Sequence, residues 1–301
     1  MPTELPEGPI AGFQRRRLPG EGVTIDALVG GSGPPLLLLH GYPQTRLMWR
    51  AIAPALAQRF TVVVPDLRGY GRSDKPAGDG GEAVYAKRTM AKDQLATMAA
   101  LGFERFAVAG HDRGGRVAYR LALDHPQAVS AVAVLDIIPT ADVWGRMTAE
   151  GAMAMYHWYF LARPYPLPEQ LIGGNAEFYL RTTMQSWASR GFSFAPENMA
   201  DYVACFADAA TIHASCEDYR AGWRVDRELD EADRGVAKIS APLMAIWGAE
   251  FGVARSEPLK TWSAWAENVC GHEVAGGHFV CEEQPEQVGR LLAQFFSDHA
   301  A

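Results

Sequence analysis

Short apolar runs alternate with segments of helical spacing along the first half of the chain. The apolar runs lie between glycine, proline and other turn-forming residues, so they predict strands. These predicted strands cover residues 23–29, 36–39, 61–64, 106–109 and 131–135. Between them, apolar residues three and four positions apart predict helices over residues 47–58, 88–100 and 115–123. This alternation favours an α/β fold with a mostly parallel sheet that helices cover on both faces.

The pattern changes between Pro139 and Arg234. This segment is rich in Trp, Tyr, Phe and Met and has no β-like runs, which predicts a helical insertion. Strand character returns over residues 243–247 and, more weakly, over 268–274, and a closing helix is expected over 285–296. We therefore expect a core domain formed by residues 1–138 and 235–301, with a helical cap domain formed by residues 139–234.

The composition narrows the class of protein. The 301 residues include 28 basic and 35 acidic side chains, a net charge of −7, which gives no basic face for nucleic acid. The apolar runs are too short to span a membrane, and residues 1–7 lack the apolar centre of a signal peptide. Cys205, Cys216, Cys270 and Cys281 have no metal-ligand spacing, which is typical of reduced thiols in a cytoplasmic protein.

The most informative segment is the turn after the fourth predicted strand. There Gly110-His-Asp112-Arg-Gly114 connects an apolar strand to a helix, which is typical of a nucleophile elbow. The residue at the elbow is usually Ser, and in this chain it is Asp112. Alone, the same pattern also fits an Asp that caps a helix.

Other segments favour the elbow. His40-Gly41-Tyr42-Pro43 follows a predicted strand, where an oxyanion-hole loop belongs, and Asp66 to Asp74 follows the next strand and is expected to be structural. Gly276-Gly277-His278-Phe279 lies just before the closing helix. A nucleophile, then an acid, then a histidine is the order found in the α/β-hydrolase fold.

The chain resembles the α/β-hydrolase superfamily over nearly its full length. Within it, the chain is similar to the fluoroacetate dehalogenases, also called haloacetate dehalogenases, in residues 110–120, 135–140, 156–160 and 216–220. The resemblance implies an α/β-hydrolase fold and conversion of 2-haloacetates, such as fluoroacetate and chloroacetate, to glycolate and halide. It implies no metal, no organic cofactor and a homodimer.

The residue types at these positions suit a two-step reaction. Asp112 is ionised at pH 7 and can displace a leaving group from an sp³ carbon, which forms an ester. His278 can then take a proton from the water that cleaves the ester, while an acid orients its ring. We favour Asp136 as that acid, with Glu250 as the alternative.

Two arginines and three donors complete the predicted site. Arg113 and Arg116 can bind a substrate carboxylate in bidentate fashion; the alternative is a structural salt bridge to the cap or to Asp136. The resemblance assigns both arginines to carboxylate binding and assigns halide binding to His157, Trp158 and Tyr219. The fold places the oxyanion hole at the backbone N–H groups of Tyr42 and Arg113.

Other functions fit parts of this pattern. An epoxide hydrolase uses the same Asp and His, and Tyr156, Tyr159 and Tyr219 could protonate its leaving alkoxide. A haloalkane dehalogenase or a binding protein without catalysis also fits the fold. Two arginines beside the nucleophile favour an anionic substrate, and a complete set of catalytic positions favours an enzyme.

Overall fold

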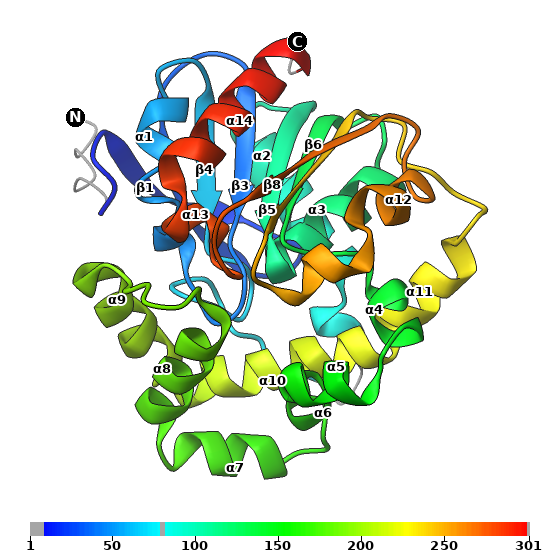
Figure 1. Ribbon diagram of the computed structural model, residues 1–301. Coiled ribbons are helices and arrows are strands. Elements are labelled where there is room, and N and C mark those ends of the chain that lie inside the picture. Colours follow the sequence, from blue (N-terminus) through cyan, green and yellow to red (C-terminus); the bar gives the residue numbers. More distant parts are fainter. Residues whose placement is uncertain (1–8, 79–81, 300–301) are drawn as a thin grey trace, which may run out of the picture.

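One mixed sheet forms the centre of the molecule (Figure 1). The computed structural model describes residues 9–78 and 82–299, and within them eight strands pair in the order β1-β2-β4-β3-β5-β6-β7-β8. The first two strands are antiparallel to their neighbours and the others are parallel. The strands are β1 (Phe13–Pro19), β2 (Thr24–Gly30), β3 (Pro35–Leu39), β4 (Thr61–Pro65), β5 (Phe106–His111), β6 (Val129–Leu135), β7 (Leu243–Gly248) and β8 (Val269–Val274).

Helices cover both faces of the sheet, and the central strands are apolar for that reason. Every residue of β5, β6 and β7 is buried, as expected for parallel strands between two helical layers. Helix α2 (Lys87–Ala100) packs against α3 (Asp112–Asp124) on one face, and α1 (Ala53–Leu56) packs against α14 (Pro285–His299) on the other (Figure 1). The predicted α/β fold with a mostly parallel sheet is confirmed.

The segment between β6 and β7 is helical and lies beyond the carboxyl ends of the parallel strands (Figure 1). We refer to residues 140–233 as the cap. Its helices are α4 (Thr140–Gly145), α5 (Ala149–Ala154), α6 (Tyr156–Leu161), α7 (Leu167–Gly173), α8 (Ala176–Trp187), α9 (Pro196–Phe206), α10 (Ala209–Trp223) and α11 (Val225–Asp233). Shorter elements after β7 and β8 are η3 (Gly252–Ser256), α12 (Pro258–Ser263) and α13 (Val280–Glu283), and η2 (Glu82–Tyr85) precedes α2.

Two local predictions differ from the structure. The helix expected over residues 47–58 is instead η1 (Arg46–Trp49) followed by α1. Pro54 has no N–H group to continue the first helix, and it lies in the first turn of the second. The sequence pattern also missed β1. This strand is at the edge of the sheet, and the four residues 14–17 in its middle are exposed, so it lacks the apolar alternation of a half-buried strand.

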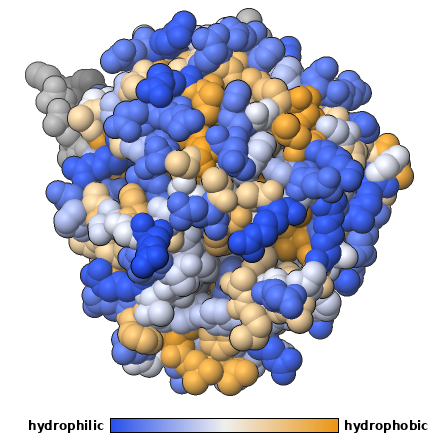
Figure 2. Space-filling model, viewed as in Figure 1, coloured by the Kyte–Doolittle hydropathy of each residue, from blue (hydrophilic) through white to orange (hydrophobic). Residues whose placement is uncertain are grey.

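Apolar side chains are exposed on the cap. Leu167 and Leu171 of α7 and Phe178 of α8 are exposed, and apolar residues gather over this part of the face in Figure 2. No helix among the described residues has the length and apolar character needed to cross a membrane. The segment 1–7, for which no signal peptide is expected, lies outside the described residues. A homodimer stays a prediction.

The N-terminus of α3 touches the end of β3, and this contact requires a glycine. A Cβ atom on Gly114 would collide with the carbonyl oxygen of His40 and lie 2.7 Å from that of Leu39. Gly114→Ala should therefore lower the free energy of unfolding by about 1–3 kcal/mol, the usual cost of overpacking. Urea unfolding of both proteins measures the difference. As a control, Gly173→Ala adds a methyl group with no atom within 4 Å and should not destabilise the protein. Equal stability of the two variants would contradict the proposed contact.

Candidate active site

Asp112 lies at the sharp turn between β5 and α3. Its φ angle is +46°, in the left-handed region that L-residues rarely adopt, as expected for a nucleophile elbow. The turn is possible because small residues surround it: a Cβ atom on Gly41 would lie 2.5 Å from the Cβ of Asp112. The elbow thus aims the Asp112 carboxylate toward the cap, where only 7% of the residue's surface is exposed.

The loop after β3 supplies a hydrogen bond to this carboxylate. The backbone N–H of Tyr42 donates to Oδ1 of Asp112 over 2.9 Å. This N–H group is one of the two predicted for the oxyanion hole, and the structure brings it to the Asp112 carboxylate. The corresponding role of the Arg113 N–H stays a prediction.

His278 and Asp136 form a hydrogen-bonded pair beside the elbow. Nδ1 of His278 lies 2.6 Å from Oδ2 of Asp136, and Nε2 lies 3.8 Å from Oδ2 of Asp112. The other oxygen of Asp136 accepts a hydrogen bond from the Gly248 N–H over 3.0 Å. Glu250, the alternative acid, is exposed. The structure therefore places Asp136, and not Glu250, beside the histidine.

The charges around the elbow set the protonation of these groups. Burial disfavours the imidazolium form of His278, but the hydrogen bond and the charge of Asp136 outweigh it and raise the pKa of His278 above 6.5. Burial likewise disfavours ionised Asp112, but His278, His111, Arg113 and Arg116 together lower the pKa of that carboxyl. Asp112 is therefore ionised at neutral pH, which a nucleophilic carboxylate requires.

Arg113 is held by the cap. Its Nε and Nη2 donate to the two carboxylate oxygens of Asp218 over 3.0 and 2.7 Å, and Nη2 also donates to the Asp218 carbonyl. This is the salt bridge to the cap that the sequence left as an alternative. The remaining nitrogen, Nη1, is buried and has no hydrogen-bond partner among the described residues. The ion pair therefore leaves one donor of Arg113 free.

Arg116 has a different environment. Its Nη1 donates to the carbonyl of Ile138 and to the Thr140 hydroxyl, over 3.1 and 3.0 Å. Its guanidinium carbon lies 4.7 Å from the centre of the Trp158 ring, a cation–π contact. Within the described part of the chain, Nε is buried without a partner and no ion pair joins Arg116 to a carboxylate. Burial and the nearby Arg113 lower the pKa of Arg116.

The three predicted halide donors lie together on the cap side of the site. The rings of His157 and Trp158 lie 5.6 and 6.2 Å from the ring of Tyr219. The Tyr219 hydroxyl and Nδ1 of His157 are buried and have no partner among the described residues. Burial lowers the pKa of His157 to about 3, so its ring is neutral at pH 7. Such unpaired polar atoms are costly unless a ligand or water meets them.

The other tyrosines considered for an epoxide hydrolase lie elsewhere. Tyr156 is 47% exposed and Tyr159 is 42% exposed. By contrast, the aromatic ring of Trp187 lies at the site: its centre is 4.4 Å from that of the His157 ring and 5.6 Å from that of the His278 ring. Of the three tyrosines, only Tyr219 is buried near the elbow.

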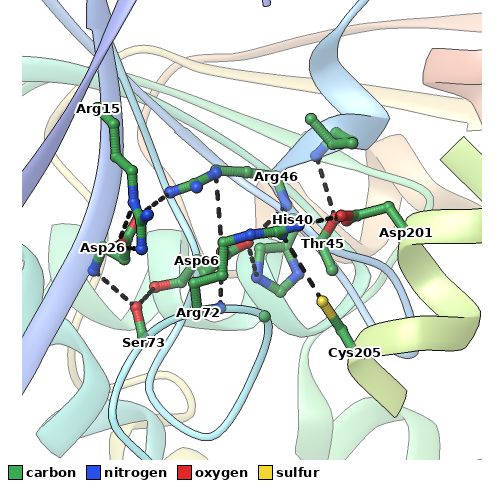
Figure 3. A network of polar contacts seen from close by, with 12 residues as sticks. Arg15, Asp26, His40, Thr45, Arg46, Asp66, Arg72, Ser73, Asp201 and Cys205 are labelled. Carbon is green, nitrogen blue, oxygen red and sulfur yellow. Dashed lines mark hydrogen bonds and ion pairs between the residues drawn. The ribbon is translucent and has the colours of Figure 1, made fainter. Parts of the chain in front are cut away.

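A network of ion pairs supports the loops that form the site (Figure 3). Asp66 accepts hydrogen bonds from the backbone N–H groups of Arg46 and Arg72, each over 2.9 Å. Arg72 in turn pairs with Asp201 of α9, which also accepts a hydrogen bond from Thr45 over 2.6 Å. These contacts fix the loops after β3 and β4 relative to each other and join them to the cap. The structural role expected for residues 66–74 agrees with this arrangement.

Among the residues that the structure describes, one cluster of side chains has ligand atoms close enough for a metal. Glu169, His213 and Glu217 place these atoms within 4.8 Å of one another on the cap. However, Nη1 of Arg220 already lies 2.8 Å from Glu169 and 2.6 Å from Glu217. The guanidinium supplies the positive charge that a metal would bring, so we assign no metal to this cluster.

An aspartate on the elbow, a histidine after the last strand and an acid after β6 define an α/β hydrolase. The model of the α/β-hydrolase-fold family matches residues 34–285, and the chain belongs to this family. It is 44% identical over 290 residues to a fluoroacetate dehalogenase from Burkholderia sp., covering 95% of each chain. It is also 36% identical over 281 residues to a soluble epoxide hydrolase from Corynebacterium sp. (strain C12), covering 92% of this chain and 94% of the relative.

A solved structure has the same architecture. A candidate α/β hydrolase from Nostoc sp. PCC 7120 superposes with a TM-score of 0.92 at 46% identity, over 95% of this chain and 98% of its own. The resemblance to fluoroacetate dehalogenases is therefore confirmed, and the chain is a hydrolase of the α/β fold.

Asp218 is the residue at this site that the sequence did not reveal. It lies 105 positions from Arg113 in the sequence, so no local sequence pattern predicts the ion pair between them. The available signal was its place directly before Tyr219, in the segment that carries the family resemblance.

The His278–Asp136 pair should make stability depend on pH. Folding raises the pKa of His278, so the native state binds that proton more tightly than the unfolded chain does. The contribution to the free energy of unfolding is complete below pH 6.5 and is lost as the pH rises through the raised pKa. Urea unfolding of wild type and His278→Gln should give a stability difference that shrinks with rising pH. A difference that grows instead would contradict the assignment.

Proposed function

We propose that the protein is a hydrolytic dehalogenase that converts 2-haloacetates to glycolate and halide through an ester on Asp112. The observation that carries this proposal is a buried carboxylate, that of Asp112, beside two arginines. Each arginine has a buried nitrogen without a hydrogen-bond partner in the described part of the chain. A small anion is the ligand that such nitrogens would bind. Fluoroacetate dehalogenase activity in a relative that is 44% identical supports the same substrate class.

The first step is a displacement at the substrate α-carbon. The substrate carboxylate binds to Arg113 and Arg116, which hold the α-carbon in front of Asp112. One carboxylate oxygen of Asp112 forms a bond to that carbon, and the carbon–halogen bond breaks with its electron pair on the halide. Hydrogen bonds to the departing halide come from His157, Trp158 and Tyr219. These bonds replace the hydration that a small anion lacks in a buried site.

The second step cleaves the ester. Water attacks the carbonyl carbon of the esterified Asp112, and Nε2 of His278 takes the proton. The N–H groups of Tyr42 and Arg113 stabilise the negative oxygen that forms. The bond to the glycolate oxygen then breaks, and His278 returns the proton to that oxygen. Asp112 is restored with one oxygen from water, and the net reaction consumes one water and releases one halide and one proton.

Epoxide hydrolysis is the second candidate. It uses the same Asp112 and His278. The buried hydroxyl of Tyr219, which has no partner among the described residues, could protonate the opening epoxide. The relative from Corynebacterium sp. (strain C12) supports this option. The exposure of Tyr156 and Tyr159 and the two arginines favour the haloacetate instead.

Product assays separate these two functions. Wild type should release fluoride from fluoroacetate and chloride from chloroacetate, with glycolate formed in equal amount, whereas Asp112→Ala should release neither. Ion-selective electrodes measure both halides. Styrene oxide is the comparison substrate: diol formation without halide release from either haloacetate would make the protein an epoxide hydrolase and end the proposal.

The proposed ester should accumulate when water activation is removed. His278→Gln keeps Asp112 and both arginines, so it should release one halide per active site and then slow by at least about 10²-fold, the usual contribution of a general base. Mass spectrometry of the stalled protein should find one carboxymethyl group on the peptide that contains Asp112. Halide release with no added mass on that peptide would argue for direct attack by water.

A further inference from the structure

The carboxylate of Asp218 lies behind Arg113 and is fully occupied by donors. Besides the two bonds from Arg113, it accepts a hydrogen bond from the Tyr70 hydroxyl over 2.6 Å and an ion pair from the Lys87 ammonium group. Asp218, Lys87 and Arg113 are all buried. These contacts lower the pKa of Asp218 because Arg113 and Lys87 outweigh the effect of burial. Asp218 is therefore a fixed negative charge.

This carboxylate holds Arg113 in one orientation. Binding through both Nε and Nη2 uses the planar edge of the guanidinium, so the group cannot rotate without breaking both bonds. The guanidinium carbon of Arg113 also lies 4.3 Å from the centre of the Tyr219 ring. Nη1 is the nitrogen that remains unpaired. Asp218 on α10 and the adjacent Tyr219 thus fix a donor group that belongs to α3.

The positive charges of Arg113 and Lys87 are balanced by nearby carboxylates. Lys87 lies between two carboxylates, those of Asp218 and Asp226, and Asp226 also accepts a hydrogen bond from the Lys87 N–H over 2.7 Å. Two positive groups, Arg113 and Lys87, are thereby matched by two negative ones. Arg113 can offer a directed hydrogen bond, but it brings little net charge to the substrate.

Arg116 is matched less directly. Its contact to the Thr140 hydroxyl continues to the Tyr119 hydroxyl over 3.0 Å, and Tyr119 donates to Asp230 over 2.7 Å. Two hydroxyl groups therefore separate Arg116 from this carboxylate. The positive charge that an anionic substrate meets comes mainly from Arg116.

We infer that Asp218 is a positioning residue for substrate-carboxylate binding: it orients Arg113 for a directed hydrogen bond while Arg116 supplies the charge. This inference rests on the proposed function, since it concerns the same anionic substrate. It assigns a different task to each arginine.

Asp218→Asn tests the inference. The variant keeps the size of the side chain but loses the charge and one acceptor for Arg113. It should raise KM for chloroacetate and the inhibition constant of glycolate by about tenfold or more, as expected when a hydrogen bond between charged groups is weakened. Both constants are independent of the fraction of active enzyme, so a merely structural defect would lower kcat and leave them unchanged.

The neighbouring Glu217→Gln is the matched control. Glu217 precedes Asp218 on the same helix and is buried, but it pairs with Arg220 rather than Arg113. It should leave both constants at the wild-type values. If Asp218→Asn does not fold, Tyr70→Phe removes one donor to Asp218 and keeps the ion pair; it should raise both constants about threefold.

The outcomes separate the inference from the proposed function. Wild-type halide release with unchanged constants in Asp218→Asn, or in Tyr70→Phe where the former does not fold, overturns the positioning role and leaves the dehalogenase intact. If wild type releases no halide, calorimetry with glycolate decides: binding that weakens in the variant supports the positioning role and rejects the reaction. No glycolate binding to wild type overturns both.

Discussion

A buried carboxylate is stable only where positive charge and hydrogen bonds replace the water it has lost, and this requirement organises the molecule around Asp112. The Tyr42 N–H contacts it directly, while His278, Arg113 and Arg116 provide the charge that lowers its pKa. Each of these groups comes from a different part of the chain or from the first two turns of α3. The fold is therefore the means by which distant donors meet at one carboxylate.

The parallel sheet makes this meeting possible. The loops after β3, β5, β6 and β8 leave the same edge of the sheet, and they carry Tyr42, Asp112, Asp136 and His278. Such an edge is where ligands bind in open α/β sheets. Both Asp112 and Asp136 have positive φ angles, of +46° and +51°, so the backbone is turned sharply at two adjacent strand ends to bring the carboxylates near the histidine. The cap then closes the edge with His157, Trp158 and Tyr219.

The sequence revealed those parts of the site that local patterns encode. The strand, the glycines and the helix around Asp112 are continuous in the sequence over residues 106–124, so the elbow could be predicted, and so could the strands of the buried sheet. Two acids fitted the third position, and the contacts of the folded chain distinguish them: Asp136 reaches His278, while Glu250 is exposed. The Asp218 contact could not be predicted because it joins the cap to the core across 105 positions of the chain, and no local pattern records such a pairing.

The same charges bear on the choice between an anionic and a neutral substrate. A neutral epoxide would leave Arg116 buried with a free Nε and without an ion-pair partner among the described residues, a cost that folding must bear whenever the site is empty. For a neutral substrate, an apolar side chain at position 116 could pack against Trp158 without this cost. A buried arginine at that position is therefore better explained by an anionic substrate. The same reasoning does not apply to Arg113, because its charge is already paired with that of Asp218. The case for an anionic substrate therefore rests on Arg116, the less compensated of the two arginines.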